Sequence, residues 1–188
     1  MKSNPLIESN FTCPWWLLFT FDNPFRSLLM NPRKLLSPYI RPGDTILDVG
    51  CGMGFCSLEL ARLTGATGKV YAADLQMKML EGLQKRAQVA GLEEQIKPWW
   101  CGPEQIGIPE PVDVVLAMWM VHEVSNRRAF IDEIYSLLKV DGILLIVEPI
   151  IHVGLNNFNK TLQICNEVGF MEFSYPNVAL SRAVVFIK

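Results

Sequence analysis

Apolar residues in this chain form two kinds of pattern, short β-prone runs and stretches with helical spacing. The runs predict strands at 46–49, 68–74, 95–101, 112–118, 143–147, 171–175 and 183–187. The helical stretches between them predict helices at 55–63, 76–90, 126–138 and 158–168. Strands that alternate with helices are typical of a doubly wound, Rossmann-like α/β sheet, and the short link between the last two strands predicts an antiparallel pair.

The segment before the first strand has a different pattern. Residues 11–21 are rich in aromatic side chains, and two Asn-Pro pairs, typical of helix starts, predict short helices at 24–30 and 32–40. We expect residues 1–40 to be an N-terminal helical segment and residues 41–188 to be the cofactor-binding core of one domain. The segment either packs against the sheet or a partner in a homodimer, or covers the ligand as a lid. A weak contact with a membrane surface is a third option.

Composition and charge exclude several classes of function. Apolar residues make up 50% of the 188 residues, and the net charge of −2 gives no electrostatic basis for binding nucleic acid. Five cysteines without a C-x-x-C pair, and only two histidines, do not predict a metal site or a disulfide scaffold. No apolar run reaches the roughly 20 residues of a membrane span. We therefore expect a cytoplasmic protein without a signal peptide, a metal or a stable membrane insertion.

Three glycines mark the most informative turn of the chain. Gly50, Gly52 and Gly54 follow the first predicted strand and precede the first helix of the core. Glycine allows backbone to approach a ligand closely, and a helix N-terminus offers free N–H groups. A dinucleotide-binding fingerprint would have its third glycine at position 55, which is Phe55 here, so a nicotinamide-dependent dehydrogenase is disfavoured. A tight turn without any ligand is the alternative.

The run from Asp48 to Gly54, D-V-G-C-G-M-G, resembles the first motif of class I S-adenosylmethionine-dependent methyltransferases, D/E-x-G-x-G-x-G. The D-V-V-L run of the fourth strand and the L-L-K-V-D-G turn after it are also similar to that family. The resemblance covers about residues 40–188 and is greatest to small enzymes grouped with ubiquinone and menaquinone biosynthesis methyltransferases. It implies a seven-stranded sheet in the order 3-2-1-4-5-7-6, with strand 7 antiparallel, and S-adenosyl-L-methionine as cofactor.

Asp74 ends the second predicted strand, 24 positions after the first glycine. A carboxylate there can accept hydrogen bonds from both hydroxyls of a ribose, although it could instead only cap the next helix. Leu75 and Gln76 would then lie near the adenine. In the family an acid after the third strand often reaches the adenine amine. The matching position here is Gly102, so that contact would fall to backbone or to Glu104.

The ends of the fourth and fifth strands are expected to meet the reacting groups. Met118 and Trp119 would line the methionine arm of the cofactor, and Glu148 ends the fifth strand at the same edge. His122 and Glu123 are the candidate catalytic residues, because histidine can remove a proton near neutral pH. The alternative is that His122 only bonds backbone near the start of the next helix. The expected cofactor-binding residues are Asp48, Gly50, Cys51, Gly52, Gly54, Asp74, Leu75, Gln76, Gly102, Met118 and Trp119.

These residues predict S-adenosylmethionine-dependent methyl transfer to a small-molecule substrate, an apolar or aromatic acceptor, by in-line displacement. A module that binds the cofactor without catalysis is the alternative.

Overall fold

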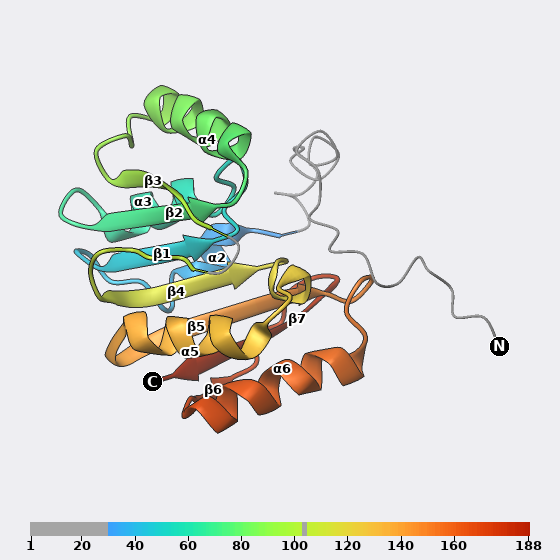
Figure 1. Ribbon diagram of the computed structural model, residues 1–188. Helices are drawn as coiled ribbons and strands as arrows, with labels where there is room; N and C mark the ends of the chain where they lie inside the picture. The colour runs from blue at the N-terminus through green and yellow to red at the C-terminus, as the bar shows by residue number, and fades with distance from the viewer. Residues whose placement is uncertain (1–29, 103–104) are drawn as a thin grey trace.

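The computed structural model describes residues 30–102 and 105–188, and a seven-stranded sheet forms its centre (Figure 1). Neighbouring strands follow the order β3-β2-β1-β4-β5-β7-β6. The first five strands are parallel, and β7 runs antiparallel to both β5 and β6. The predicted fold class and strand order are therefore confirmed. The strands are β1 Thr45–Val49, β2 Lys69–Asp74, β3 Ile96–Trp100, β4 Val112–Met118, β5 Leu138–Pro149, β6 Met171–Ser174 and β7 Ser181–Ile187.

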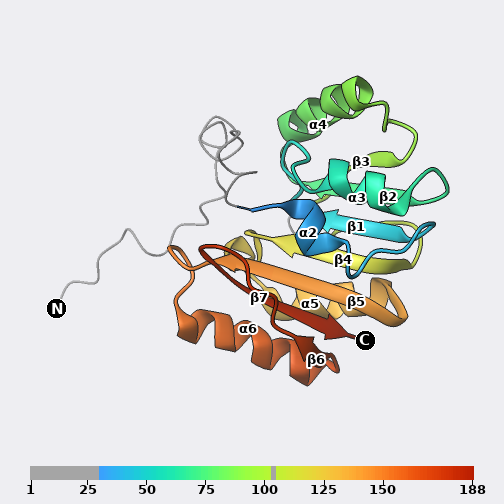
Figure 2. The ribbon, with the colours of Figure 1, turned by 180° about the vertical axis from the view of Figure 1, so that it is seen from behind.

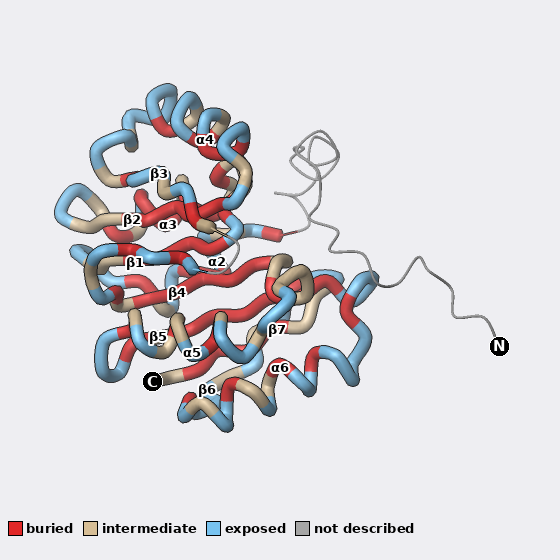
Figure 3. Tube along the Cα trace, in the orientation of Figure 1, coloured by how far each residue is buried: buried red, intermediate tan, exposed pale blue. Residues whose placement is uncertain are grey.

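Helices cover both faces of this sheet (Figures 1 and 2). One face carries α2, α3 and α4, and the other carries α5 and α6. A separate hydrophobic core therefore lies on each face of the sheet. Neighbouring residues of β1 point to opposite cores, Ile46 to the core under α2, α3 and α4 and Leu47 to the core under α5 and α6. Strands buried on both sides read as continuous apolar runs, and the central strands are buried along most of their length (Figure 3). The α-helices are α2 Pro32–Leu36, α3 Ser57–Thr64, α4 Met77–Ala90, α5 Arg127–Leu137 and α6 Leu155–Val168.

The helix ends follow the local signals in the sequence. Asn126 accepts a hydrogen bond from the Ala129 N–H at 3.1 Å and so caps α5. Gly91 and Gly169 end α4 and α6 in the left-handed conformation. In the part of the chain that the structure describes, no helix has the length and apolarity needed to cross a membrane.

The predicted helix at 32–40 is shorter than expected. Asn31 caps it as predicted, by accepting the Lys34 N–H at 3.1 Å, but α2 ends at Leu36. Pro38 explains the early end, because proline has no N–H to donate to the Lys34 carbonyl one turn earlier, although Ser37 before it keeps helical backbone angles. The predicted helix at 24–30 lies almost entirely outside the described residues, and the packing or lid role of residues 1–40 stays a prediction.

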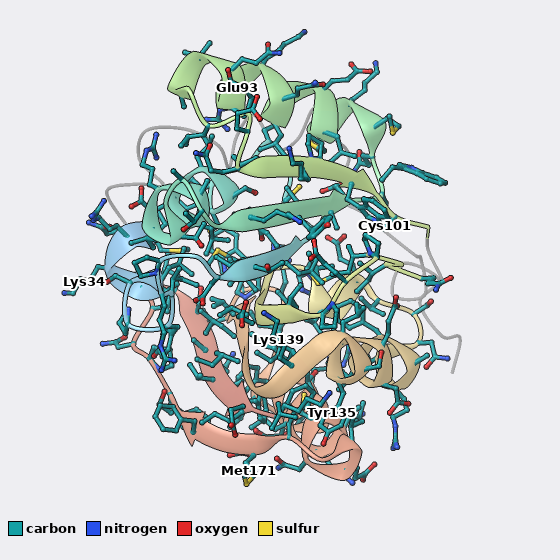
Figure 4. The ribbon with its side chains drawn as sticks, turned by 90° about the vertical axis from the view of Figure 1, so that its left-hand side faces the viewer. Lys34, Glu93, Cys101, Tyr135, Lys139 and Met171 are labelled. Atoms are coloured by element: carbon teal, nitrogen blue, oxygen red, sulfur yellow. The ribbon has the colours of Figure 1, made fainter. Side chains whose placement is uncertain are left out.

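The predicted turn at 140–142 is instead an irregularity within a single long strand. Strand β5 begins at Leu138, so Leu138 is not part of the preceding helix, and its pairing with β4 shifts between Val112 and Val114. Asp141 accommodates the irregularity with a φ of +60°. The ion pair from Lys139 Nζ to Asp113, at 2.8 Å, links the two strands there, at the end of the sheet seen in Figure 4. The chain therefore joins α5 to β5 without a separate loop.

Candidate cofactor and acceptor site

The glycine turn lies at the carboxyl end of β1, at the edge toward which the arrows of the parallel strands point in Figure 1. Helix α3 begins at Ser57, two residues later than predicted, so the turn runs through Cys56. The N–H groups of Gly50 and Cys51 both donate to the Ala73 carbonyl of β2, at 2.9 and 3.1 Å. The neighbouring strand therefore holds the turn in place through backbone hydrogen bonds.

Each glycine of the turn has positive φ, but their surroundings differ. A Cβ on Gly54 would lie 2.1 Å from Leu83 Cδ1 of α4, and one on Gly50 would lie 2.8 Å from Met120 Cγ. A Cβ on Gly52 would have no atom within 4 Å. Gly50 and Gly54 are thus required by packing, whereas Gly52 presents its backbone to open space. The open space beside Gly52 suits the close approach of a ligand such as the predicted cofactor.

Asp74 connects the glycine turn to the end of β2. Its Oδ2 accepts the Gly52 N–H at 2.9 Å, and its Oδ1 accepts the Gln76 N–H at 2.8 Å. Burial raises the pKa of Asp74, while hydrogen bonds from the backbone of Gln76, Gly52 and Leu75 act in the opposite direction. Gln76, rather than Asp74, is the N-cap residue of α4. Each carboxylate oxygen can accept more than one hydrogen bond, so a ribose diol can be bound in addition.

Asp48 and Cys51 are more buried than Gly50, which lies between them in the sequence. The Asp48 carboxylate is buried and accepts a hydrogen bond from the Ser57 hydroxyl at 2.6 Å, which connects β1 to the start of α3. Burial, together with the charges of Asp48 and Asp74, raises the pKa of the Cys51 thiol well above its usual value. Cys51 is therefore a neutral thiol at physiological pH, and Asp48 acts on the turn by positioning it.

The predicted adenine side is formed by the start of α4 and the end of β3. Leu75 is exposed, and its carbonyl accepts a hydrogen bond from the indole Nε1 of Trp100 at 3.2 Å. Trp100 itself is 59% exposed, an unusual value for so large an apolar ring, and the sequence reasoning did not select it. Gly102 donates its N–H to the Gln105 carbonyl at 3.1 Å and has no side chain to reach a ligand. The alternative at Glu104 lies outside the described residues.

Trp119 follows β4 in an unusual conformation. Its φ is +59°, a region that costs a non-glycine residue about 1–3 kcal/mol unless its surroundings hold it there. Two hydrogen bonds hold it, one from its N–H to the Val147 carbonyl at 2.7 Å and one from its indole Nε1 to Ser181 Oγ at 3.0 Å. Met118 is buried and its sulfur lies 3.5 Å from Cys56 Sγ. Of the two, Trp119 is the more exposed at this edge.

His122 lies in a short 3-10 helix, η2 Val121–Glu123, just after Trp119. Its ring Nδ1 is 2.5 Å from Oε2 of Glu148, at the end of β5, and its backbone N–H donates to Oε1 of the same carboxylate at 3.3 Å. The ring therefore bonds a carboxylate, which differs from the alternative that it only bonds backbone. Glu148 is 2% exposed, and sequence reasoning placed it at this edge without a role. The feature of the sequence that could have identified Glu148 is an acidic residue directly after the apolar run of the predicted fifth strand.

The charges around His122 affect its titration in opposite directions. Burial of the ring lowers the pKa of His122, but the hydrogen bond with Glu148 and the charges of Glu148 and Glu123 outweigh burial and the nearby Arg127. The pKa of His122 is therefore raised above its usual 6.5. The ring of His152 lies parallel to that of His122, with centroids 6.1 Å apart.

All the predicted site residues thus come from one edge of the sheet. The cofactor candidates lie at the carboxyl ends of β1, β2, β3 and β4 or in the residues directly after these strands, and the catalytic candidates lie in η2, just after β4. Within residues 30–102 and 105–188, no three His, Cys, Asp or Glu side chains gather as metal ligands.

Comparison with known proteins agrees with this geometry. Residues 46–142, just over half of the chain, match the family described as a methyltransferase domain. A 2-phytyl-1,4-naphtoquinone methyltransferase of Trichormus variabilis is 50% identical over 102 residues, which cover 53% of this chain and 44% of that protein. A ubiquinone/menaquinone biosynthesis C-methyltransferase UbiE of Hydrogenovibrio crunogenus is 29% identical over 110 residues, 58% of this chain and 43% of that protein. The chain spans about half the length of these curated relatives.

Solved structures show the same fold. A SAM-dependent methyltransferase from Aquifex aeolicus has a TM-score of 0.83 and 25% identity, over 94% of this chain and 99% of that chain. A structure from Methanococcus maripaludis has a TM-score of 0.76 at 17% identity, over 100% of this chain and 97% of that chain, and supports the fold alone. The chain therefore belongs to the class I methyltransferase family, whose cofactor is S-adenosylmethionine.

Proposed function

We propose that this chain transfers a methyl group from S-adenosylmethionine to a small apolar or aromatic acceptor, with a quinone-type ring as the first candidate. The observation that carries the proposal is the arrangement of Gly52 and Asp74, an open backbone position bonded to a buried carboxylate at the edge of the sheet. The named quinone methyltransferases among the relatives support the acceptor class.

The chain's own residues would hold the cofactor in three places. The backbone of Gly52 and the carboxylate of Asp74 would receive the ribose, since a carboxylate can accept from two hydroxyls. Leu75 and Trp100 offer exposed apolar surface beside it for the adenine. Trp119 would border the methionine end, where an aromatic face favours a positively charged sulfur. When bound, the cofactor supplies a methyl group already activated by that sulfur.

The acceptor side would exclude water and handle one proton. Trp119 is held at this side by its indole hydrogen bond, and Ile150 directly follows β5 and is exposed. A hydroxyl or carbon acid must lose a proton when it is methylated, and His122 would accept that proton as general base, with Glu123 adding negative charge nearby. In-line displacement needs little else from the protein beyond alignment of the two reactants.

Calorimetry and product analysis test the proposal. We expect S-adenosylmethionine and S-adenosylhomocysteine to bind in the micromolar range and NAD to bind much more weakly, because the glycine spacing differs from the dinucleotide fingerprint. Mass spectrometry of a panel of quinols, phenols and thiols incubated with S-adenosylmethionine should reveal a methylated product. NAD binding more tightly than S-adenosylhomocysteine would contradict the proposal. Cofactor binding without any product across the panel would favour a non-catalytic module.

The cytoplasmic location, the homodimer and the absence of nucleic-acid binding stay predictions from the sequence. Light scattering during size-exclusion chromatography tests the homodimer directly.

A further inference from the structure

Glu148 contacts both the ring and the backbone of one residue. Its Oε2 lies 2.5 Å from His122 Nδ1, and its Oε1 accepts the His122 N–H at 3.3 Å. Because the two oxygens belong to one rigid carboxylate, the two contacts together restrict both the place of His122 and the rotation of its ring. The strand β5 fixes the carboxylate in turn, since it pairs with β4 on one side and β7 on the other.

We propose that Glu148 is a positioning residue that holds His122 with its proton on Nδ1, so that Nε2 is the nitrogen that takes a proton from the acceptor. The inference rests on the proposed methyl transfer and deepens it. It specifies an acceptor that is methylated at an atom bearing hydrogen, a carbon acid or a hydroxyl. The acceptor's bond to hydrogen breaks, the proton goes to Nε2, and the electron pair stays on the acceptor atom as the nucleophile.

The burial of Glu148 explains why His122 carries its proton on Nδ1. Glu148 is 2% exposed, whereas the His122 side chain is 22% exposed, so the carboxylate is buried and the ring is the more accessible member of the pair. A buried carboxylate without a hydrogen-bond donor is costly, and an imidazole with Nδ1–H is the donor that the structure provides. The carboxylate thereby selects the tautomer, as an acid does when it orients a histidine in other catalytic sites.

Within residues 30–102 and 105–188, four other charged or titratable groups lie around the pair. Glu123 adds negative charge from η2, Arg127 adds positive charge from α5, and His152 lies parallel to His122 after β5. Arg182 stands opposite Glu148 in the register of β7, and its guanidinium donates to the Val153 carbonyl at 2.6 Å. Glu148 is the only one of these groups within hydrogen-bond distance of the His122 ring according to the contacts of residues 30–102 and 105–188.

A titration of the two histidines by NMR tests the pairing without any acceptor. The chain contains only His122 and His152, so a His152→Gln variant assigns both imidazole signals. We expect Glu148→Gln to lower the pKa of His122 by about one pH unit or more, because the negative charge next to the ring is removed. Glu133→Gln is the matched control. It removes a carboxylate that accepts the N–H groups of Ile106 and Gly107, and it should leave the His122 pKa unchanged.

An unchanged His122 pKa in Glu148→Gln would overturn the inference even if methyl transfer is confirmed. Conversely, a wild-type protein that binds cofactor but forms no product would overturn the proposed function, while the titration would still report on the pair. If Glu148→Gln does not fold, Glu148→Asp is the second variant, because it keeps the charge but draws it back by one methylene. Its expected result is a lower His122 pKa than in the wild type, and no change would again overturn the inference.

Turnover separates positioning from a general structural role. With the identified acceptor, Glu148→Gln should lower kcat about tenfold or more and move the acid limb of the pH profile to lower pH, with S-adenosylhomocysteine affinity within about twofold. In a His122→Ala background the same change should have no further effect on kcat, since Glu148 acts through the ring. An equal loss of kcat in both backgrounds would overturn the inference.

Discussion

The proposed site has a cofactor half and an acceptor half, and the two are built in different ways. On the cofactor half, the turn is held by backbone N–H groups, with Gly50 and Cys51 bonded to Ala73 and Gly52 bonded to Asp74. On the acceptor half, side chains from distant segments bond each other, as His122 does with Glu148 and Trp119 does with Ser181. The comparison shows a cofactor half whose shape depends on local glycines and an acceptor half that depends on strand register. Each can therefore be damaged separately.

The largest expected effect comes from adding a side chain at Gly54, in the glycine turn of the cofactor half. Gly54→Ala should lower the free energy of unfolding by about 3 kcal/mol, because the new Cβ meets the fully buried Leu83 and the φ of +86° strains alanine. Thermal or urea unfolding without cofactor measures it.

Gly52→Ala is the matched control for Gly54→Ala. Its Cβ would meet nothing within 4 Å, so only backbone strain of about 1–2 kcal/mol is expected. If the cofactor uses that open space, the Gly52→Ala variant should lose more free energy of S-adenosylhomocysteine binding than free energy of unfolding. Equal unfolding free energies for the two variants would show that packing on α4 does not distinguish these glycines.

The next largest effect is a loss of turnover without a loss of cofactor affinity, caused by a change in the acceptor half. His122→Ala should lower turnover at least about a hundredfold through loss of the general base, while the dissociation constant of S-adenosylhomocysteine changes by less than about twofold. Steady-state kinetics and calorimetry measure the two quantities. A variant with full turnover would return His122 to a structural role, and a large loss of cofactor affinity would show that the two halves are not separable.

Asp74→Ala should produce the opposite result in the cofactor half. Losing a charged acceptor for the ribose should weaken S-adenosylhomocysteine about ten- to a hundredfold, a cost of about 1.5–3 kcal/mol. Because Asp74 also bonds Gly52 and Gln76, we expect a modest loss of thermal stability as well. An unchanged dissociation constant would assign the carboxylate to holding the turn alone.

The smallest effect is expected at Ser181. Ser181→Ala removes the hydroxyl that accepts the Trp119 indole N–H and should raise the acceptor KM about fivefold, the worth of about 1 kcal/mol for one hydrogen bond. Ser181→Thr keeps a hydroxyl and should retain most of the affinity. Equal KM values in the two variants would show that the indole does not need this bond.

This contrast also explains what sequence analysis could predict. The strand order, the glycine turn and Asp74 were accessible because each depends on residues close together in the chain, or on a family motif. The pairing of His122 with Glu148 was not, because the two are 26 positions apart and meet only when β4 and β5 align. Trp100 was overlooked because its exposure, rather than its presence, makes it informative.

The two corrections in the fold have similarly local causes. Pro38 ends α2 early because it lacks a backbone N–H, an effect that a pattern of apolar residues does not predict. The Val140-Asp141-Gly142 run has the composition of a turn, but the ladder with β4 continues around it because Asp141 tolerates positive φ. In both places the backbone properties of one residue decided the outcome, ending a predicted helix at Pro38 and allowing a strand to continue through Asp141.

The reversed direction of β7 has a consequence for how acceptor choice can diverge among related chains. Because β7 runs against β5, it starts at the reactive edge, and Ser181 stands opposite Pro149. The preceding connection, residues 175–180, reaches that edge too, where the Leu180 carbonyl accepts the Ile150 N–H at 3.0 Å. Exchanges or insertions in this late connection would reshape the rim beside Trp119 and leave the glycine turn and its parallel strands untouched. The hairpin of β6 and β7 can thus vary in sequence and length at the acceptor side while the cofactor-binding part of the sheet stays the same.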